Sequence, residues 1–263
     1  LTGEYDSSNA ILTFHAGAGG TEAQDWVSML VRMYTKWADR HGFKVEILDM
    51  LDGEEAGIKS ASLHIQGFNA YGFLKSENGV HRLVRVSPFN AQGKRMTSFA
   101  SVFVTPLVDD TIEVYVDPSK ITWDLFRSGG AGGQNVNKVE TGVRLRYQYT
   151  DPDTGETEEI LIENTETRKQ TENRENAMRL LRSQLYDREL KRRNAAKAKI
   201  EAGKKKIEWG SQIRSYVFMP YTLVKDNRTG YESSNVQAVM DGDLDGFIFA
   251  YLKAASRGEL KED

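Results

Sequence analysis

Glycines crowd one short stretch of the chain, and a single amide follows them. The run is Arg127-Ser128-Gly129-Gly130-Ala131-Gly132-Gly133-Gln134-Asn135-Val136-Asn137. Glycine has no Cβ, so its backbone can adopt left-handed conformations and bring main-chain N–H groups directly against a ligand. The side chain of Gln134 has no acid–base capacity near neutral pH, so it can position a water molecule but cannot deprotonate one. The composition is typical of a loop that presents backbone donors to a ligand.

A glycine-rich run is also typical of a flexible linker. Here a strand-like sequence, residues 141–149, begins directly after the run. A tether needs no ordered strand immediately behind it. We therefore favour a ligand-approaching loop over a linker.

The eleven-residue run resembles the loop with which class I peptide chain release factors enter the ribosomal peptidyl transferase centre. In that family the loop promotes attack of water on the ester of P-site peptidyl-tRNA, and it does so only together with the ribosome. The resemblance implies that the backbone N–H of Gln134 donates to the developing oxyanion, while Gly132 and Gly133 supply the conformation. It also implies a methyltransferase that converts Gln134 to N5-methylglutamine, a recycling GTPase as a further partner, and no cofactor.

Ser87, Pro88 and Phe89 form a second group of mixed chemistry. The Ser87 hydroxyl can donate and accept, Pro88 fixes the backbone, and Phe89 offers an apolar contact. Taken alone, these three residues are typical of an ordinary turn. Beside the glycine loop they resemble the anticodon-like tripeptide of the bacterial class I release factors of type 2. That resemblance implies recognition of the mRNA stop codons UAA and UGA, and not UAG.

The same resemblance places further residues near the codon. The tip of the first helix, Gly20 to Glu22, should approach the first base, and Thr97 the third. Met96 departs from the family pattern, which usually has a histidine before the threonine. A histidine ring would stack on a base, whereas methionine provides a flexible, polarizable contact.

Four cations flank the tripeptide and are candidates for contact with RNA phosphates. They are Arg82, Arg85, Lys94 and Arg95. Such contacts fix the position of a protein on RNA without reading its sequence. Single-stranded RNA suits this arrangement, because its exposed base edges can be read by hydroxyls and backbone groups.

The net charge of −3 conceals a strong asymmetry. Residues 168–206 carry 14 Lys or Arg and 5 Asp or Glu, which is +9, so the rest of the chain carries −12. A segregated basic segment on an acidic protein indicates contact with phosphates, and the alternative is a solvated helix face. Beside the glycine loop we favour contact with ribosomal RNA, with an affinity that falls steeply with salt.

Several classes of function are disfavoured. The chain has no cysteine, which excludes disulfides, thiolate chemistry and cysteine-ligated zinc. The four histidines show no ligand spacing, so we expect no metal site. The glycine cluster at residues 17–20 precedes a helix but lacks the Gly-Lys-Ser/Thr ending of a nucleotide loop. No apolar run approaches the roughly 20 residues of a membrane helix, so we expect a cytoplasmic protein without membrane contact.

The hydrophobic pattern predicts an α+β, multidomain fold. A capping box of Thr21 and Gln24 should start a helix that His41-Gly42 ends. Strands are expected at 9–14, 43–48, 58–65, 71–75, 80–86, 98–105, 111–116 and 209–216. A hairpin is expected from 144–149 and 159–163, a long basic helix at 173–201 with Met178, Leu181 and Leu185 inward, and a closing amphipathic helix at 244–255.

The resemblance divides this chain into domains. An α/β codon-recognition domain, 1–110 with 208–238, is interrupted by an inserted peptidyl-tRNA hydrolysis domain, 111–207. Residues 239–263 form a short C-terminal helical segment packed on the recognition domain. Because the chain starts at Leu1 rather than methionine, we expect a fragment or processed product that lacks the amino-terminal helical domain of the family.

Two other functions remain as alternatives. A codon-independent ribosome-rescue hydrolase shares the glycine-glycine-glutamine loop, but it is usually a small domain with a basic tail, whereas residues 258–263 here are acidic. A plain RNA-binding module fits the basic helix but leaves Gln134 without a role.

Overall fold

The computed structural model describes residues 1, 3–108, 111–127, 140–208 and 212–260. These residues form two compact units, one of residues 1–109 and 199–263 and the other of residues 110–198. As predicted, the fold is α+β and multidomain, with one long helix and two sheets. Within the described residues, every helix is too short or too polar to cross a membrane.

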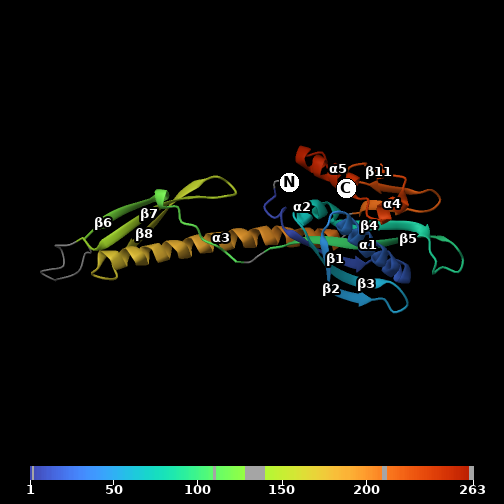
Figure 1. The fold of residues 1–263 in the computed structure, drawn as a ribbon, viewed down its shortest axis with the longest axis horizontal. Helices are drawn as coiled ribbons and strands as arrows, with labels where there is room; N and C mark the ends of the chain where they lie inside the picture. The colour runs from blue at the N-terminus through green and yellow to red at the C-terminus, as the bar shows by residue number, and fades with distance from the viewer. Residues whose placement is uncertain (2, 109–110, 128–139, 209–211, 261–263) are drawn as a thin grey trace. The chain divides into compact units, whose positions relative to one another are not determined.

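An eight-stranded sheet organises the first unit (Figure 1). Its order is β11-β10-β9-β4-β5-β1-β3-β2. All neighbouring strands pair antiparallel except β4 and β9, which are parallel. The strands are β1 (Asn9–Ala16), β2 (Lys44–Asp52), β3 (Ile58–Gln66), β4 (Gly79–Val86), β5 (Arg95–Leu107), β9 (Gln212–Val217), β10 (Leu223–Asp226) and β11 (Glu232–Ser233).

Helix α1 (Gly20–Arg40) packs its apolar stripe on this sheet. The stripe includes Trp26, Leu30, Tyr34 and Trp37, all fully buried. Gly42 adopts φ +69° after the helix, which confirms the predicted stop. The predicted capping box is wrong, because the helix begins after Gly19 and no side chain caps it.

Four shorter helical elements complete the first unit: α2 (Ala70–Leu74), the 3₁₀ turn η1 (Lys75–Glu77), α4 (Val236–Met240) and α5 (Asp245–Arg257). The closing helix was predicted, and its Phe247 and Ile248 belong to the same hydrophobic core as α1. The strand predicted at 71–75 is wrong. Ala70, Gly72 and Leu74 are the buried positions of α2, and over five residues this alternation cannot be distinguished from that of a strand.

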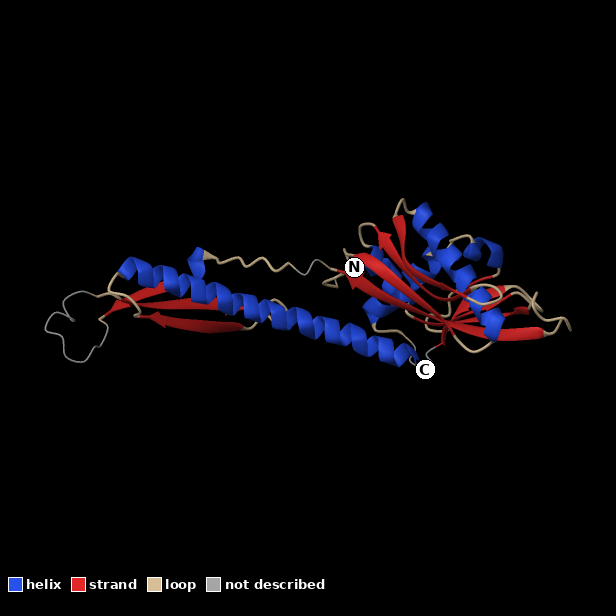
Figure 2. Ribbon diagram, turned by 90° about the horizontal axis from the view of Figure 1, so that it is seen from below, coloured by secondary structure: helices blue, strands red, loops and turns tan. Residues whose placement is uncertain are grey.

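The second unit consists of a three-stranded sheet against part of a long helix (Figure 2). Its elements are η2 (Pro118–Lys120), β6 (Ile121–Phe126), β7 (Gly142–Thr150), β8 (Thr157–Asn164) and α3 (Gln170–Glu208). The β7–β8 hairpin and the helix confirm the prediction. Leu181 and Leu185 of α3 are buried against the sheet, and Met178 packs at the edge of this core.

Residues 111–116 form no strand, contrary to prediction. Val114 and Val116 still pack against the core of the second unit, which explains the alternating pattern. The strand that pairs with β7 is instead β6, which the sequence pattern did not indicate.

A fully buried ionic cluster lies between β9, β10 and η1. Arg214 of β9 donates from both terminal nitrogens to Glu77, at 2.6 and 2.8 Å, and from one of them to Asp226, at 3.1 Å. Burial alone would raise the pKa of each carboxyl, but Arg214 reverses this, so the pKa values of Glu77 and Asp226 are both lowered. All three side chains are therefore charged near neutral pH.

His81 of β4 completes this cluster in its neutral form. Its Nε2 donates to the backbone carbonyl of Glu77, at 3.0 Å, so Nδ1 accepts from the Tyr216 hydroxyl at 2.8 Å. Burial, reinforced by the charge of Arg214, lowers the pKa of His81 from 6.5 to about 4. The folded protein therefore resists protonation of this ring at pH values where the unfolded chain accepts it.

His81 should make the protein less stable as the pH falls from about 7 to about 5. The unfolded chain binds this proton near pH 6.5 and the folded chain only near pH 4, so the free energy of unfolding should drop by about 2 kcal/mol across that window. Urea denaturation at several pH values measures this. The His81→Gln variant keeps a donor and an acceptor but does not titrate, so its stability should vary less with pH. Equal slopes for both proteins would contradict the assignment.

Candidate functional site

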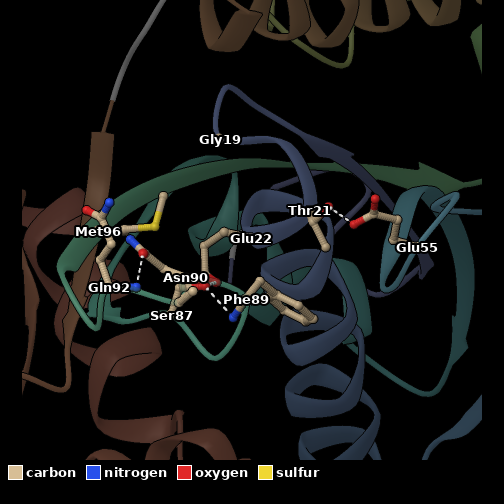
Figure 3. A pocket seen from close by; sticks show the side chains of 10 residues that line it. Gly19, Thr21, Glu22, Glu55, Ser87, Phe89, Asn90, Gln92 and Met96 are labelled. Atoms are coloured by element: carbon tan, nitrogen blue, oxygen red, sulfur yellow. Dashed lines mark hydrogen bonds between the residues drawn. The ribbon is translucent and has the colours of Figure 1, made fainter.

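The tip of the β4–β5 hairpin, the amino-terminal end of α1 and the connection between β2 and β3 line an open pocket of about 500 Å³ (Figure 3). Its lining residues are Gly19, Thr21, Glu22, Glu55, Ser87, Phe89, Asn90, Ala91, Gln92 and Met96. Four residues that the sequence singled out for codon recognition, Glu22, Ser87, Phe89 and Met96, thus line one pocket. They come from α1, the hairpin tip and β5.

The Ser87 hydroxyl uses both of its hydrogen-bonding capacities inside the protein. It is only 2% exposed, donates to Glu22 Oε2 and accepts from the backbone N–H of Phe89 at 3.1 Å. Pro88 fixes the backbone between these two residues. The tripeptide is consequently held in one conformation, with the Phe89 ring about half exposed beside the pocket.

Arg85 connects this pocket to two carboxylates of α1. Its Nε donates to Glu22 Oε1 at 2.5 Å and its terminal nitrogen to Asp25 Oδ2 at 2.6 Å. Burial opposes the charge on Arg85, but these hydrogen bonds outweigh it, and the pKa of the guanidinium is raised. Arg85 was predicted as a phosphate contact. That role stays a prediction, and the Arg85 guanidinium already donates hydrogen bonds to the carboxylates of Glu22 and Asp25.

The other predicted cations do not gather with Arg85. Side chains alternate along β4, so Arg82 lies on the face of the sheet opposite to Arg85. Lys94 and Arg95 are exposed where the chain leaves the hairpin tip and enters β5. Arg95 pairs with Val86 in the β4–β5 register. Within the described residues, neither Lys94 nor Arg95 makes an ion pair, so both remain available to phosphates.

Two further predicted residues, Gly20 and Thr97, do not line the pocket, and Thr97 follows Met96 on β5, so its side chain lies on the opposite face of the sheet. Gly20 adopts φ +59° with open space at its Cβ position, which lets the backbone approach a ligand. Thr97 is exposed and pairs with Val84 in the β4–β5 register. Met96 stands at one end of the pocket and Glu55 at the other in the view of Figure 3, and Glu55 accepts from the Thr21 hydroxyl at 3.4 Å.

The glycine-rich run, with Gly132, Gly133 and Gln134, lies outside the described residues. The strands that it joins are described. β6 and β7 pair up to Phe126 and Gly142, so the run connects two neighbouring strands. Behind it, Asn173 of α3 is fully buried and donates from Nδ2 to the carbonyl of Thr141 at 2.8 Å and to that of Thr167 at 2.9 Å. Thr141, just before β7, is therefore tied to the start of α3.

Part of the basic segment is neutralised within the second unit. Arg188 pairs with Glu158, and Arg192 and Arg193 both pair with Glu189. Arg182 and Lys191 have exposed side chains and are candidates for contact with RNA phosphates.

Sequence reasoning missed several residues of the pocket. Asp25, Glu55, Asn90 and Gln92 were not singled out, although Asp25 braces Arg85 and the others line the cavity. Glu22 and Asp25 are three residues apart and therefore share one face of the helix. This spacing was the signal in the sequence that could have indicated a shared cationic partner. Among the described residues, no cluster of metal-ligating side chains is present. The pocket offers hydroxyl, carboxylate and amide groups, which suit the reading of base edges.

Comparisons with known proteins agree on one family. The model of the PCRF domain matches residues 1–102, and that of the RF-1 domain matches residues 110–228. Peptide chain release factor 2 of Lactiplantibacillus plantarum is 55% identical over 253 residues, which are 96% of this chain and 65% of the relative. The protein of the same name from Listeria innocua is 52% identical over 254 residues, 97% of this chain and 67% of the relative.

A solved structure, RF2 of Thermus thermophilus, is similar in both sequence and fold. It shares 45% identity and a TM-score of 0.60, with 98% of this chain and 71% of that chain covered. The chain spans about two thirds of the length of the curated relatives that it matches.

Removing Arg85 should destabilise the first unit, because it leaves the buried carboxylate of Glu22 without its cation. We expect Arg85→Ala to lower the free energy of unfolding by about 3 kcal/mol. Urea denaturation measures this, with Arg82→Ala as the matched control on the opposite face of the strand. Adding Glu22→Gln to Arg85→Ala should restore part of the loss, since the stranded charge is then gone. An Arg85→Ala protein as stable as the Arg82→Ala protein would contradict the proposed pairing.

Proposed function

Because the chain belongs to the peptide chain release factor family, we propose that it acts in translation termination. It recognises UAA and UGA in the ribosomal A site and triggers hydrolysis of the P-site peptidyl-tRNA ester. One observation carries this proposal: α1 and the β4–β5 tip bring Glu22, Ser87 and Phe89 to one pocket, in a chain that also holds Gly132-Gly133-Gln134.

The two units take different parts of the task. Residues 1–110 with 208–238 read the codon on the small subunit, with residues 239–263 as a supporting helical segment. Residues 111–207 carry the glycine-glycine-glutamine run to the large subunit. The exposed cations of α3 contact ribosomal RNA phosphates. The protein works in the cytoplasm with a methyltransferase that modifies Gln134 and a GTPase that recycles the factor.

The hydrolytic step needs no acid or base from the protein. Water attacks the ester carbonyl carbon, the carbonyl oxygen gains negative charge, and the backbone N–H of Gln134 donates to that oxygen. The bond from the carbonyl carbon to the tRNA ribose oxygen then breaks, and the ribose oxygen leaves as a hydroxyl with the proton that the water has lost. The Gln134 side chain orients the water, because an amide cannot take its proton. The family resemblance of the run supports these roles.

The codon pocket reads bases with groups that are already fixed. Asp25 accepts from Arg85, Arg85 donates to the Glu22 carboxylate, and Glu22 accepts from the Ser87 hydroxyl. The proton of the Ser87 hydroxyl is committed to Glu22, so a base can only donate to its remaining lone pair. That acceptor is already oriented, so little conformational entropy is lost on binding.

Replacing Gly133 should abolish peptide release without preventing ribosome binding. A Cβ at this position blocks the backbone path that presents the Gln134 N–H, and the loss of one such donor slows the step about 100- to 1,000-fold. Single-turnover release from ribosomes stopped at UGA measures the effect for Gly133→Ala. Gly203→Ala is the control, since Gly203 lies in α3 with nothing within 4 Å of its Cβ position. Unchanged release by Gly133→Ala would refute the role.

The tripeptide should set the choice of codon. We expect release at UAA and UGA, and little at UAG or a sense codon. Ser87→Ala should lower release at UAA and UGA about tenfold, because a buried hydrogen-bonding group is lost. The exposed helical Ser256→Ala serves as the control. Equal activity at UAG would defeat the codon assignment, and activity on ribosomes stalled at sense codons would favour the rescue alternative.

A further inference from the structure

A second hairpin tip lies beside the tripeptide, formed by residues 218–222 between β9 and β10. β9 runs parallel to β4, with Val84 opposite Val217, and the backbone N–H of Phe218 donates to the carbonyl of Val84 at 2.8 Å. Leu223 of β10 then pairs back to Val217. Neighbouring strands are about 4.8 Å apart, so both tips leave the same end of the sheet as neighbours.

This second tip presents large side chains to solvent from a fixed base. Phe218 packs against the hydrophobic core of the first unit, whereas Met219 is 48% exposed and Tyr221 is 59% exposed. On the neighbouring tip, Val86 and Phe89 are exposed as well. Single exposed hydrophobic residues are common on protein surfaces. Since Val84 lies opposite Val217, Val86 and Met219 are neighbours across the two tips, and together with Tyr221 they make this end of the sheet a candidate binding surface.

The charges around this surface favour a nucleic acid. On the β4–β5 tip and at the start of β5, the charged residues are Lys94 and Arg95. Residues 218–222 of the second tip contain neither Asp nor Glu. Both cations are exposed and lack an ion pair within the part of the chain that the structure describes. Exposed aromatic rings beside unpaired cations are typical of surfaces that bind single-stranded nucleic acid, in which bases stack and phosphates pair with the cations. The core of a protein interface is instead depleted of charge.

The position of the tip separates it from the codon pocket. The sheet order is β9-β4-β5, and the pocket lies on the β5 and α1 side of β4, where Met96 and Glu22 line it. Residues 218–222 lie on the other side of β4. A ligand of this tip is therefore distinct from the ligand of the pocket.

We propose that Met219 and Tyr221 form a stacking platform for an unpaired base of small-subunit ribosomal RNA, and that Lys94 and Arg95, which lie across β4 at the start of β5, pair with phosphates of the same RNA strand. This inference rests on the proposed function. The platform contributes affinity for the ribosome and does not discriminate between codons, because stacking on an aromatic face tolerates every base.

The test compares Tyr221→Ala with Tyr221→Phe, which retains the ring. The factor concentration that gives half-maximal release at UAA and UGA should rise about tenfold for Tyr221→Ala at both codons. It should change little for Tyr221→Phe, and the rate at saturation should be unchanged for both. Phe68→Ala is the matched control, since Phe68 is 75% exposed at the opposite end of the same sheet, beyond β3.

Chemical probing of the small-subunit RNA identifies the partner. Wild type and Tyr221→Phe should protect a base that Tyr221→Ala leaves reactive. Three outcomes would each overturn the platform. The first is a half-maximal concentration that Tyr221→Ala leaves unchanged, and the second is a loss of release at only one of the two codons. The third is identical protection of the RNA by all three proteins, which would point to a ribosomal protein as the partner. Inactivity of the wild-type chain at UGA would instead defeat the proposed function, and the platform with it.

Discussion

The buried guanidinium of Arg214 is the constraint on which the first unit depends. A fully buried charge is tolerated only where opposite charges and hydrogen bonds match it. Glu77 takes both terminal nitrogens, Asp226 takes one, and the ring of Phe247 lies 4.6 Å from the guanidinium carbon. β9 comes after the whole second unit in the sequence, so its pairing with β4 is a long-range contact. Specific interactions are needed to define its position and register in the sheet. A slip of one residue would turn Arg214 to the other face of the sheet, which makes any other register costly.

The position of the proposed codon pocket follows from this register. β9 is aligned beside β4, and the Trp26 indole of α1 donates to the carbonyl of His81 on β4 at 3.0 Å. That bond fixes where α1 crosses the strand. Glu22 lies one helical turn before Trp26 and therefore faces Arg85. The geometry of the pocket is thus set by buried polar groups beneath it, and the pocket can keep its shape without a ligand.

Long periodic segments could be predicted from the sequence, whereas contacts between distant residues could not. Helix α1, the β7–β8 hairpin and α3 were predicted because each repeats its pattern over many residues. Helix α2 was mistaken for a strand because five residues are too few to separate the two periods. The pairing of Arg85 with Asp25 joins residues 60 positions apart, and no spacing rule encodes it. Ser87 was identified through a family resemblance and not through periodicity.

The distribution of charge is consistent with the proposed role of this surface, in which it both reads RNA and holds it. The pocket contains the exposed carboxylate of Glu55, which repels phosphates and can accept hydrogen bonds from the amino groups on base edges, whereas Glu22 is already paired with Arg85 and Ser87. The cations Lys94 and Arg95 lie outside the pocket on the hairpin tip, where phosphates can reach them. A single strand that enters this surface is therefore favoured with its bases inward and its backbone outward. This is the orientation in which the proposed reading of a codon is possible.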